Sequence, residues 1–369
     1  MSESTSRQTA ILILEDGTIF QGNAFGKIGT NTGEICFNTG MTGYQEVFTD
    51  PSYYGQVIIM NSVHVGNYGV KDADVESDSV KVKAVIGRNL EEQYSRFMAN
   101  NSLQDYFIAQ NIVAIDAIDT RALVIHIRNQ GAMNCIISSE TNDIDALKKL
   151  LAEVPSMNGL DLASVVSAKE SYTVGDEASN LRVAVLDFGV KKNILTCMSE
   201  RGAFVKVFNS KTEFEELEKF NPDGYFISNG PGDPEPLHYA VKTIRKILDA
   251  KKPFFGICLG QQLLALANDI PTFKMHHGHR GLNHPVKNLV TGKCEITTQN
   301  HGFGVNADSV KANKNIQVTH INLDDDSIEG IRLKDRPAFS VQYHPESTPG
   351  PHDSRYLFDE FFELMKSVN

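Results

Sequence analysis

Short apolar segments alternate with amphipathic ones through the second half of the chain, and this order is the strongest constraint on its fold. Strands are predicted at 183–187, 204–208, 224–228 and 253–257. Helices are predicted between them, at 191–201, 213–220 and 237–250. Strands that alternate with helices of about 10–15 residues form a parallel sheet that helices cover on both faces. We therefore expect residues 181–369 to form a doubly wound, mostly parallel α/β domain, with ligands beyond the carboxyl ends of its strands.

The first half of the chain has a more strand-like pattern. Two apolar runs flank Asp16-Gly17, and an Asp-Gly pair readily forms the tight turn of a β-hairpin. Helices are predicted at about 90–107 and at 121–128, the second with Asp119-Thr120 in the N-cap position. Residues 1–168 are therefore expected to form a β-rich α/β domain.

Length and charge narrow the class of protein further. At roughly 150 residues per domain, 369 residues suggest two domains, and the polar, aperiodic segment 167–181 is the predicted linker.

The 35 basic and 46 acidic residues give a net charge of −11 without a Lys/Arg cluster, so nucleic-acid binding is not expected. No apolar segment is long enough to span a membrane, and the first residues lack the apolar core of a signal peptide. We expect a soluble, cytoplasmic protein.

Cys258 is the first candidate for a catalytic residue. It lies in the segment 256–260, Gly-Ile-Cys-Leu-Gly, where a predicted strand gives way to the apolar helical run 262–267. Small residues around a nucleophile at a sharp strand-to-helix turn are typical of a nucleophile elbow. The helix N-terminus favours the thiolate, which is the reactive form of cysteine. A buried cysteine beside two incidental glycines is an equally good interpretation of so short a motif.

His344 and Glu346 supply the partners that a thiol nucleophile needs. They follow the predicted strand 338–342 in the sequence His-Pro-Glu. A nucleophilic thiol requires a base to accept and return its proton, and the base requires an acceptor that orients it. Any one of the 11 histidines taken alone is better explained as structural. Together with Cys258, this pair predicts a Cys-His-Glu catalytic triad.

The Gly/Pro-rich segment 228–234, Ser-Asn-Gly-Pro-Gly-Asp-Pro, also follows a predicted strand. Such segments are often simple turns. Here the turn is expected at the same sheet edge as Cys258, so that the N–H of Gly230 and the N–H of Leu259 form an oxyanion hole. One such donor typically stabilises a transition state by about 2.7–4 kcal/mol.

These motifs together resemble the class I (triad) glutamine amidotransferases. The segment 37–52, Phe-Asn-Thr-Gly-Met-Thr-Gly-Tyr-Gln-Glu-Val-Phe-Thr-Asp-Pro-Ser, is similar to the N-terminal domain of carbamoyl phosphate synthetase small chains. So are Gly66-Asn67 and the segments 118–121 and 278–285. The resemblance covers nearly the whole chain.

The resemblance implies a substrate, a partner and a set of binding residues. Glutamine would be hydrolysed through a thioester, and its ammonia delivered to a large synthetase chain that makes carbamoyl phosphate for arginine and pyrimidine biosynthesis. No cofactor is expected here, because the sequence has no nucleotide-binding loop; ATP and Mg²⁺ are expected on the partner. The residues implied to contact glutamine are Ser52, Gly230, Gly232, Leu259, Gln262, Asn300, Gly302 and Phe303.

Four histidines lie in the segment 275–284, Met-His-His-Gly-His-Arg-Gly-Leu-Asn-His. Their spacing fits no zinc signature, and the glycines do not place two of them on one helix face. The five cysteines are widely spaced without a Cys-x-x-Cys pair, so they argue against a structural zinc site as well. We therefore expect no metal, and interpret the segment as a structural loop near the glutamine pocket.

Three alternative functions remain open. An amidotransferase for another synthetase, such as those of guanine-nucleotide or anthranilate synthesis, would lack the segment 37–52. A catalytically silent regulatory or scaffolding subunit would not need Cys258, His344 and Glu346, so their presence argues against it; thiol labelling by a glutamine-like electrophile would decide. A cysteine hydrolase of γ-glutamyl peptides would act without a partner.

Overall fold

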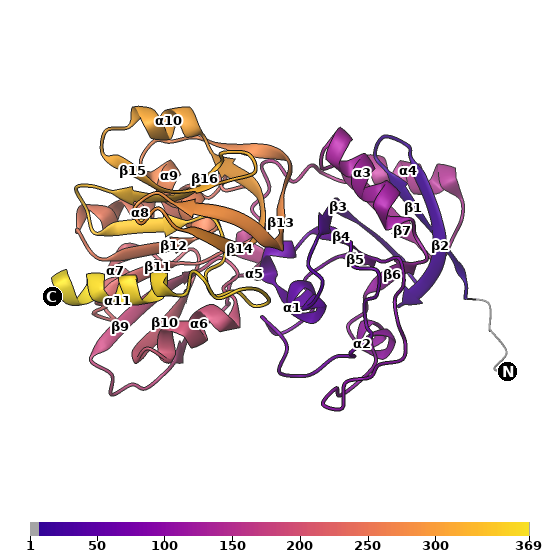
Figure 1. Ribbon diagram of the computed structural model, residues 1–369, viewed down its shortest axis with the longest axis horizontal. Coiled ribbons are helices and arrows are strands. Elements are labelled where there is room, and N and C mark those ends of the chain that lie inside the picture. Colours follow the sequence, from indigo (N-terminus) through magenta and orange to yellow (C-terminus); the bar gives the residue numbers. More distant parts are fainter. Residues whose placement is uncertain (1–6, 369) are drawn as a thin grey trace. The chain divides into compact units, whose positions relative to one another are not determined.

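The computed structural model describes residues 7–368, and the chain divides into two compact units, Met1–Met157 and Asn158–Asn369 (Figure 1). The expectation that no signal peptide is present concerns residues 1–7, of which residues 1–6 lie outside the described residues. Within residues 7–368, none of the helices combines the length and the apolar character that crossing a membrane requires.

The first unit is built on a closed β-barrel (Figure 1). Its strands are β1 (Thr9–Leu14), β2 (Ile19–Gly26), β3 (Thr30–Asn38), β4 (Gln56–Met60), β5 (Ala84–Ile86), β6 (Val113–Asp116) and β7 (Asn134–Ser138). They close in the order β1-β2-β6-β5-β4-β3-β7. The predicted hairpin is confirmed: β1 and β2 pair antiparallel, and Gly17 in their turn has φ +88°, a conformation that side chains disfavour.

Helices and an apolar core complete the first unit. The helices are α1 (Tyr44–Thr49), the short 3₁₀ helix η1 (Pro51–Tyr53), α2 (Leu103–Ala109), α3 (Thr120–Gln130) and α4 (Ile144–Ala152). Alternate strand residues such as Leu12 and Ile59 form one buried cluster with Ile127 of α3, while Ile58 packs with Phe107 of α2 in another. The predicted cap of α3 is confirmed, because the Asp119 carboxylate accepts the N–H of Ala122.

The helix predicted at 90–107 was largely wrong. Only its last part is helical, in α2, where Ser102 caps the helix by accepting the N–H of Asp105. The preceding residues instead form a loop whose amides pair with another loop: the N–H of Ser95 donates to Asn67 O and the N–H of Asn100 to Val70 O. Pairing with a segment distant in sequence has replaced the i to i+4 hydrogen bonds of a helix.

The second unit contains one sheet with the order β14-β13-β15-β16-β17-β12-β11-β9-β10-β8. Its strands are β8 (Tyr172–Val174), β9 (Leu181–Asp187), β10 (Ala203–Asn209), β11 (Gly224–Ile227), β12 (Phe254–Ile257), β13 (Thr272–Asn288), β14 (Cys294–Val305), β15 (Ile316–Asn322), β16 (Ile328–Leu333) and β17 (Ala338–Val341). Strands β10, β9, β11, β12 and β17 are parallel, and antiparallel strands flank them. The parallel centre confirms the predicted α/β class.

Helices cover both faces of the parallel centre (Figure 1). They are α5 (Ala163–Val166), α6 (Lys192–Ser199), α7 (Phe214–Glu218), α8 (His238–Asp249), α9 (Leu259–Ala267), α10 (Ala307–Ala312) and α11 (Tyr356–Val368). One buried cluster includes Ile247 of α8 and Leu263 of α9, and another includes Met198 of α6 and Phe361 of α11. These two cores are what the alternation of strands and helices predicts for a doubly wound sheet.

Two predictions about this unit are corrected by the structure. The segment 167–181 is not a free linker, because β8 within it pairs antiparallel with the edge strand β10. A short edge strand can be polar, since its side chains are exposed, so it shows no apolar periodicity. The segment 275–284 is not a loop but part of β13, whose pairing with β14 is interrupted by two register shifts. Its glycines mark those irregularities.

Candidate active site

Cys258 lies at the turn between β12 and α9, at the carboxyl edge of the parallel strands. Its φ of 54° is unusual for a residue other than glycine. A Cβ on Gly256 would lie 2.8 Å from the backbone of Gly260, and a Cβ on Gly260 would lie 2.4 Å from the Ile227 carbonyl O. The two glycines therefore make the sharp turn possible, as a nucleophile elbow requires.

The replacement Gly260→Ala is expected to destabilise the protein by about 1–3 kcal/mol, the usual cost of overpacking a filled site. Its methyl group would meet backbone atoms of β11, which cannot move as freely as a side chain. Chemical denaturation measures the loss. Gly304→Ala is the control, because the nearest atom to its Cβ is 3.4 Å away and its φ is not positive. An equal loss in both variants would contradict the steric argument.

His344 and Glu346 lie in the turn that follows β17, the strand next to β12. His344 Nδ1 is 2.7 Å from Glu346 Oε1, and both side chains are buried. The backbone N–H of His344 donates to Thr298 O on β14, which fixes the turn. His344 Nε2 makes no hydrogen bond within residues 7–368, while Cys258 is one of the groups that raise the pKa of His344.

Lys191 is a part of this site that the sequence analysis missed. It immediately precedes α6, and its ammonium donates to Glu346 Oε1 at 2.9 Å and to Thr348 O at 2.8 Å. The side chain is only 2% exposed and that of Glu346 is fully buried. A lysine before a helix normally lies in solvent, so its sequence position carries no signal for this contact.

The side chains of Lys191, His344 and Glu346 interact electrostatically as one group. Burial alone would raise the pKa of Glu346, but the charges of Lys191 and His344 hold it at about 2. Burial alone would lower the pKa of His344, but the Glu346 carboxylate and the Cys258 sulfur raise it to about 10. At neutral pH the carboxylate is therefore ionised, and it stabilises positive charge on the imidazole.

Gly230 and Leu259 lie next to each other, as we predicted because both were expected at the same edge of the sheet. Gly230 follows β11, which pairs in parallel with β12. A Cβ on Gly230 would be 2.8 Å from Leu259 Cδ2 and 2.3 Å from the Phe188 carbonyl O, so only glycine fits between them. Gly232 belongs to the same loop and lies beside Leu160 and Leu162.

Helix α9 and strand β14 are connected near Cys258 by three of the residues predicted to bind glutamine, Gln262, Asn300 and Phe303. Gln262 Nε2 donates to the Phe303 carbonyl O at 2.9 Å, and the Cys258 thiol donates to the Asn300 carbonyl O at 3.6 Å. Gln262 is buried, so it is not the exposed helix residue that its position alone suggests. Gly302 lies between the two contact points on β14. Ser52 belongs to η1 in the first unit, and its contact with glutamine stays a prediction.

The chain matches two family models. Residues 184–364 match "Glutamine amidotransferase class-I", and residues 12–137 match "Carbamoyl-phosphate synthase small chain, CPSase domain". The two matches fall in different compact units, 12–137 in the first and 184–364 in the second.

Relatives from several bacteria are similar over almost their whole length, and each bears the name carbamoyl phosphate synthase small chain. The protein of Chlorobaculum tepidum is 47% identical, with 97% of this chain and 98% of the relative aligned. The protein of Aquifex aeolicus is 47% identical, with 98% and 100% aligned. The protein of Thermotoga maritima is 46% identical, with 97% and 99% aligned.

Proposed function

Because the chain belongs to the carbamoyl phosphate synthase small-chain family, we propose that it hydrolyses glutamine through Cys258, His344 and Glu346 and delivers the ammonia to a large synthetase chain. One observation supports the proposed hydrolysis by Cys258, His344 and Glu346. The buried ion pair of His344 and Glu346 lies beside a cysteine held in a strained conformation at a strand-to-helix turn. This combination suits nucleophilic attack on a carbonyl better than any structural role.

In the first step the Cys258 sulfur attacks the side-chain amide carbon of glutamine. The thiol proton resides on His344 Nε2, as the raised pKa of His344 favours, so that the thiolate attacks beside an imidazolium. The carbonyl oxygen becomes an oxyanion that accepts the N–H groups of Gly230 and Leu259. His344 then gives the proton to the departing nitrogen. Ammonia leaves as the C–N bond breaks, and a γ-glutamyl thioester remains on Cys258.

In the second step water hydrolyses the thioester. His344 accepts a proton from the attacking water, and the carbon–sulfur bond breaks to release glutamate. The same proton returns to the sulfur of Cys258. Glu346 keeps His344 in the orientation that both transfers require, and the ionised carboxylate stabilises the imidazolium formed in each step.

The contacts of Gln262, Asn300 and Phe303 place a rigid set of polar groups beside Cys258, which fits a substrate with an amide, an ammonium and a carboxylate. Gly232, in the loop that also holds Gly230, and Gly302, on β14, are proposed to contact glutamine. Ser52 is proposed to contact it as well. ATP and Mg²⁺ act on the large chain, where bicarbonate and ammonia form carbamoyl phosphate. We propose that the complex works in the cytoplasm.

The deciding experiment measures glutamine hydrolysis by the purified chain, alone and then with a carbamoyl phosphate synthetase large chain, ATP and bicarbonate. Coupling free energies between sites are typically about 1–3 kcal/mol. We therefore expect a slow reaction alone, and a rise of about 5–150-fold in the complex, with carbamoyl phosphate formed.

Other outcomes would favour the other functions. A fast hydrolysis of glutamine whose rate does not change when the large chain is added would indicate a free-standing hydrolase. No reaction in either condition, with no labelling of Cys258 by a glutamine-like electrophile, would indicate a silent subunit. The match of residues 12–137 already disfavours service to another synthetase.

A further inference from the structure

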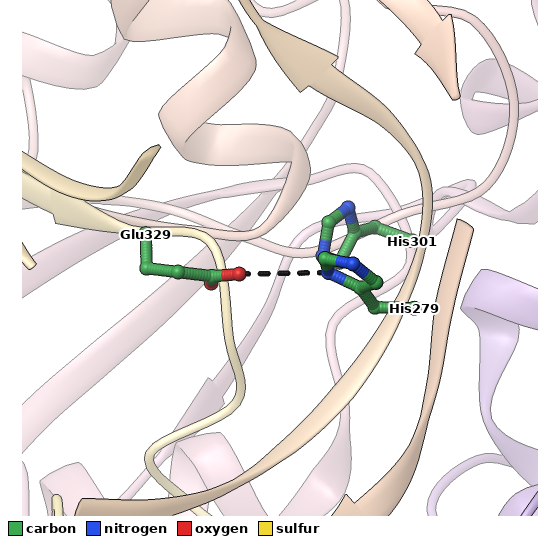
Figure 2. A group of neighbouring side chains, drawn as sticks. All are labelled: His279, His301 and Glu329. Atoms are coloured by element: carbon green, nitrogen blue, oxygen red, sulfur yellow. Dashed lines mark ion pairs between the residues drawn. The ribbon is translucent and has the colours of Figure 1, made fainter. Parts of the chain in front are cut away.

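A second group of buried ionisable side chains lies outside the proposed catalytic residues. His279 of β13, His301 of β14 and Glu329 of β16 place one ligand atom each within 4.8 Å of the others. Figure 2 shows the Glu329 carboxylate directed toward the two imidazole rings. Only His279 belongs to the histidine-rich segment 275–284, so this grouping is created by the sheet and not by local spacing.

Glu329 has an unused carboxylate oxygen although its side chain is fully buried. Its Oε1 accepts from Asn322 Nδ2 at 3.2 Å and lies 3.6 Å from His279 Nδ1. Its Oε2 has no hydrogen-bond partner within residues 7–368. In that range the one other buried carboxylate with such an oxygen is Glu346, in the candidate active site. A buried polar atom without a partner is costly, so this oxygen indicates a missing ligand.

In both His279 and His301, one ring nitrogen contacts an oxygen of another residue, as is common for histidines that bind a metal. His279 Nε2 is 2.9 Å from Asp325 Oδ2, which leaves Nδ1 toward Glu329. His301 Nδ1 donates to the Phe303 carbonyl O at 2.8 Å, and Nε2, the proposed ligand atom, would exchange its 3.1 Å contact with the Gln299 side-chain amide for the ion. A histidine that binds a metal commonly donates its other N–H to a carboxylate or a backbone carbonyl. Each of the two histidines therefore already has the supporting contact of a metal ligand on its other ring nitrogen.

We propose that His279, His301 and Glu329 bind one Zn²⁺ ion. Two imidazoles and one carboxylate are a frequent ligand set for zinc, which binds them tetrahedrally at about 2.0–2.2 Å. Such bonds set the ligand atoms about 3.4 Å apart, so the side chains close by about an ångström around the ion. His284 supplies the fourth position or leaves it to water: its Nε2 is buried without a partner within residues 7–368, and its ring centre is 5.3 Å from that of His279.

The ion would stiffen the strand that borders the candidate active site. His301 stands between Asn300 and Phe303, whose carbonyl groups accept from Cys258 and Gln262. A bridge between β13, β14 and β16 would fix this segment against the rest of the sheet. The competing explanation is a metal-free ion pair, in which a protonated His279 is held between Asp325 and Glu329.

Metal binding by the full chain separates the two explanations. After removal of metal with a chelator, equilibrium dialysis against Zn²⁺ is expected to give one tightly bound ion per chain. Saturating Zn²⁺, at about 100 times Kd, is expected to raise Tm by about 5–11 °C. Loss of a group that merely supports a ligand costs 10–100-fold in metal affinity, so Glu329→Gln should weaken binding by at least about 100-fold.

Glu295→Gln is the matched control. Glu295 is also buried on the same sheet, but its oxygens accept from Ser354 Oγ and Tyr356 OH, each at 2.9 Å. Equal zinc binding by the two variants, or no tight site in the unmodified chain, would overturn the proposal. If Glu329→Gln does not fold, Co²⁺ in the unmodified chain decides: intense visible bands of a tetrahedral site support it, and weak octahedral bands refute it.

Discussion

The replacement Cys258→Ser is expected to lower glutamine hydrolysis by at least about 10⁴-fold, within the range measured when a nucleophile of a catalytic triad is removed. A serine hydroxyl is far less acidic than a thiol, and the site is built around sulfur at the N-terminus of α9. The substituted oxygen is also smaller, so it reaches the substrate carbon less well. Release of glutamate from glutamine, with the large chain present, measures the loss.

The informative control is synthesis from free ammonia. If the chain only supplies ammonia, the complex of Cys258→Ser with the large chain should make carbamoyl phosphate from ammonia at the normal rate. Cys197→Ser is a matched variant, because Cys197 is also buried but lies on α6, and burial raises its thiol pKa to about 11. Loss of both activities in Cys258→Ser would count against a separate glutaminase site.

Features that depend on neighbouring residues in sequence were predictable. The alternation of strands and helices in the second unit reflects apolar periodicity, which is local. The nucleophile elbow needs small residues two positions on either side of Cys258, and the structure confirms that Gly256 and Gly260 face backbone atoms there. The hairpin turn at Gly17 was also predictable from a local pattern, the Asp-Gly pair between two apolar runs.

Features that depend on distant partners were not predictable in the same way. The loop before Ser102 is held by backbone hydrogen bonds to residues 67 and 70, which no local pattern reveals. Strand β8 is recognised only by its pairing with β10. In the candidate active site, Cys258, His344 and Glu346 lie in recognisable motifs, whereas Lys191 acquires its partner only when remote turns come together. Glu329, in the second group of buried ionisable side chains, acquires its partner His279 in the same way.

The replacement Lys191→Met is expected to destabilise the protein by about 3–5 kcal/mol, the usual cost of removing one partner of a buried ion pair. Glu346 would remain buried with its charge balanced by His344 alone. Methionine fills a similar volume, so the loss would report the charge and not a cavity. Urea unfolding of the two variants Lys191→Met and Lys192→Met measures it, since Lys192 is adjacent but exposed.

The dependence of stability on pH separates an electrostatic role of Lys191 from a packing role. The pKa of Glu346 is about 2 in the folded protein against 4.5 ordinarily, so its stabilising contribution is present above pH 4.5 and is lost as pH falls toward 2. Without the Lys191 ammonium the folded pKa rises, and less of this contribution exists to be lost. Stability between pH 6 and pH 3 should therefore fall less steeply in Lys191→Met than in Lys192→Met. Parallel profiles with a constant offset would assign Lys191 to packing, and would remove it from the electrostatic group that it forms with His344 and Glu346 in the proposed catalytic site.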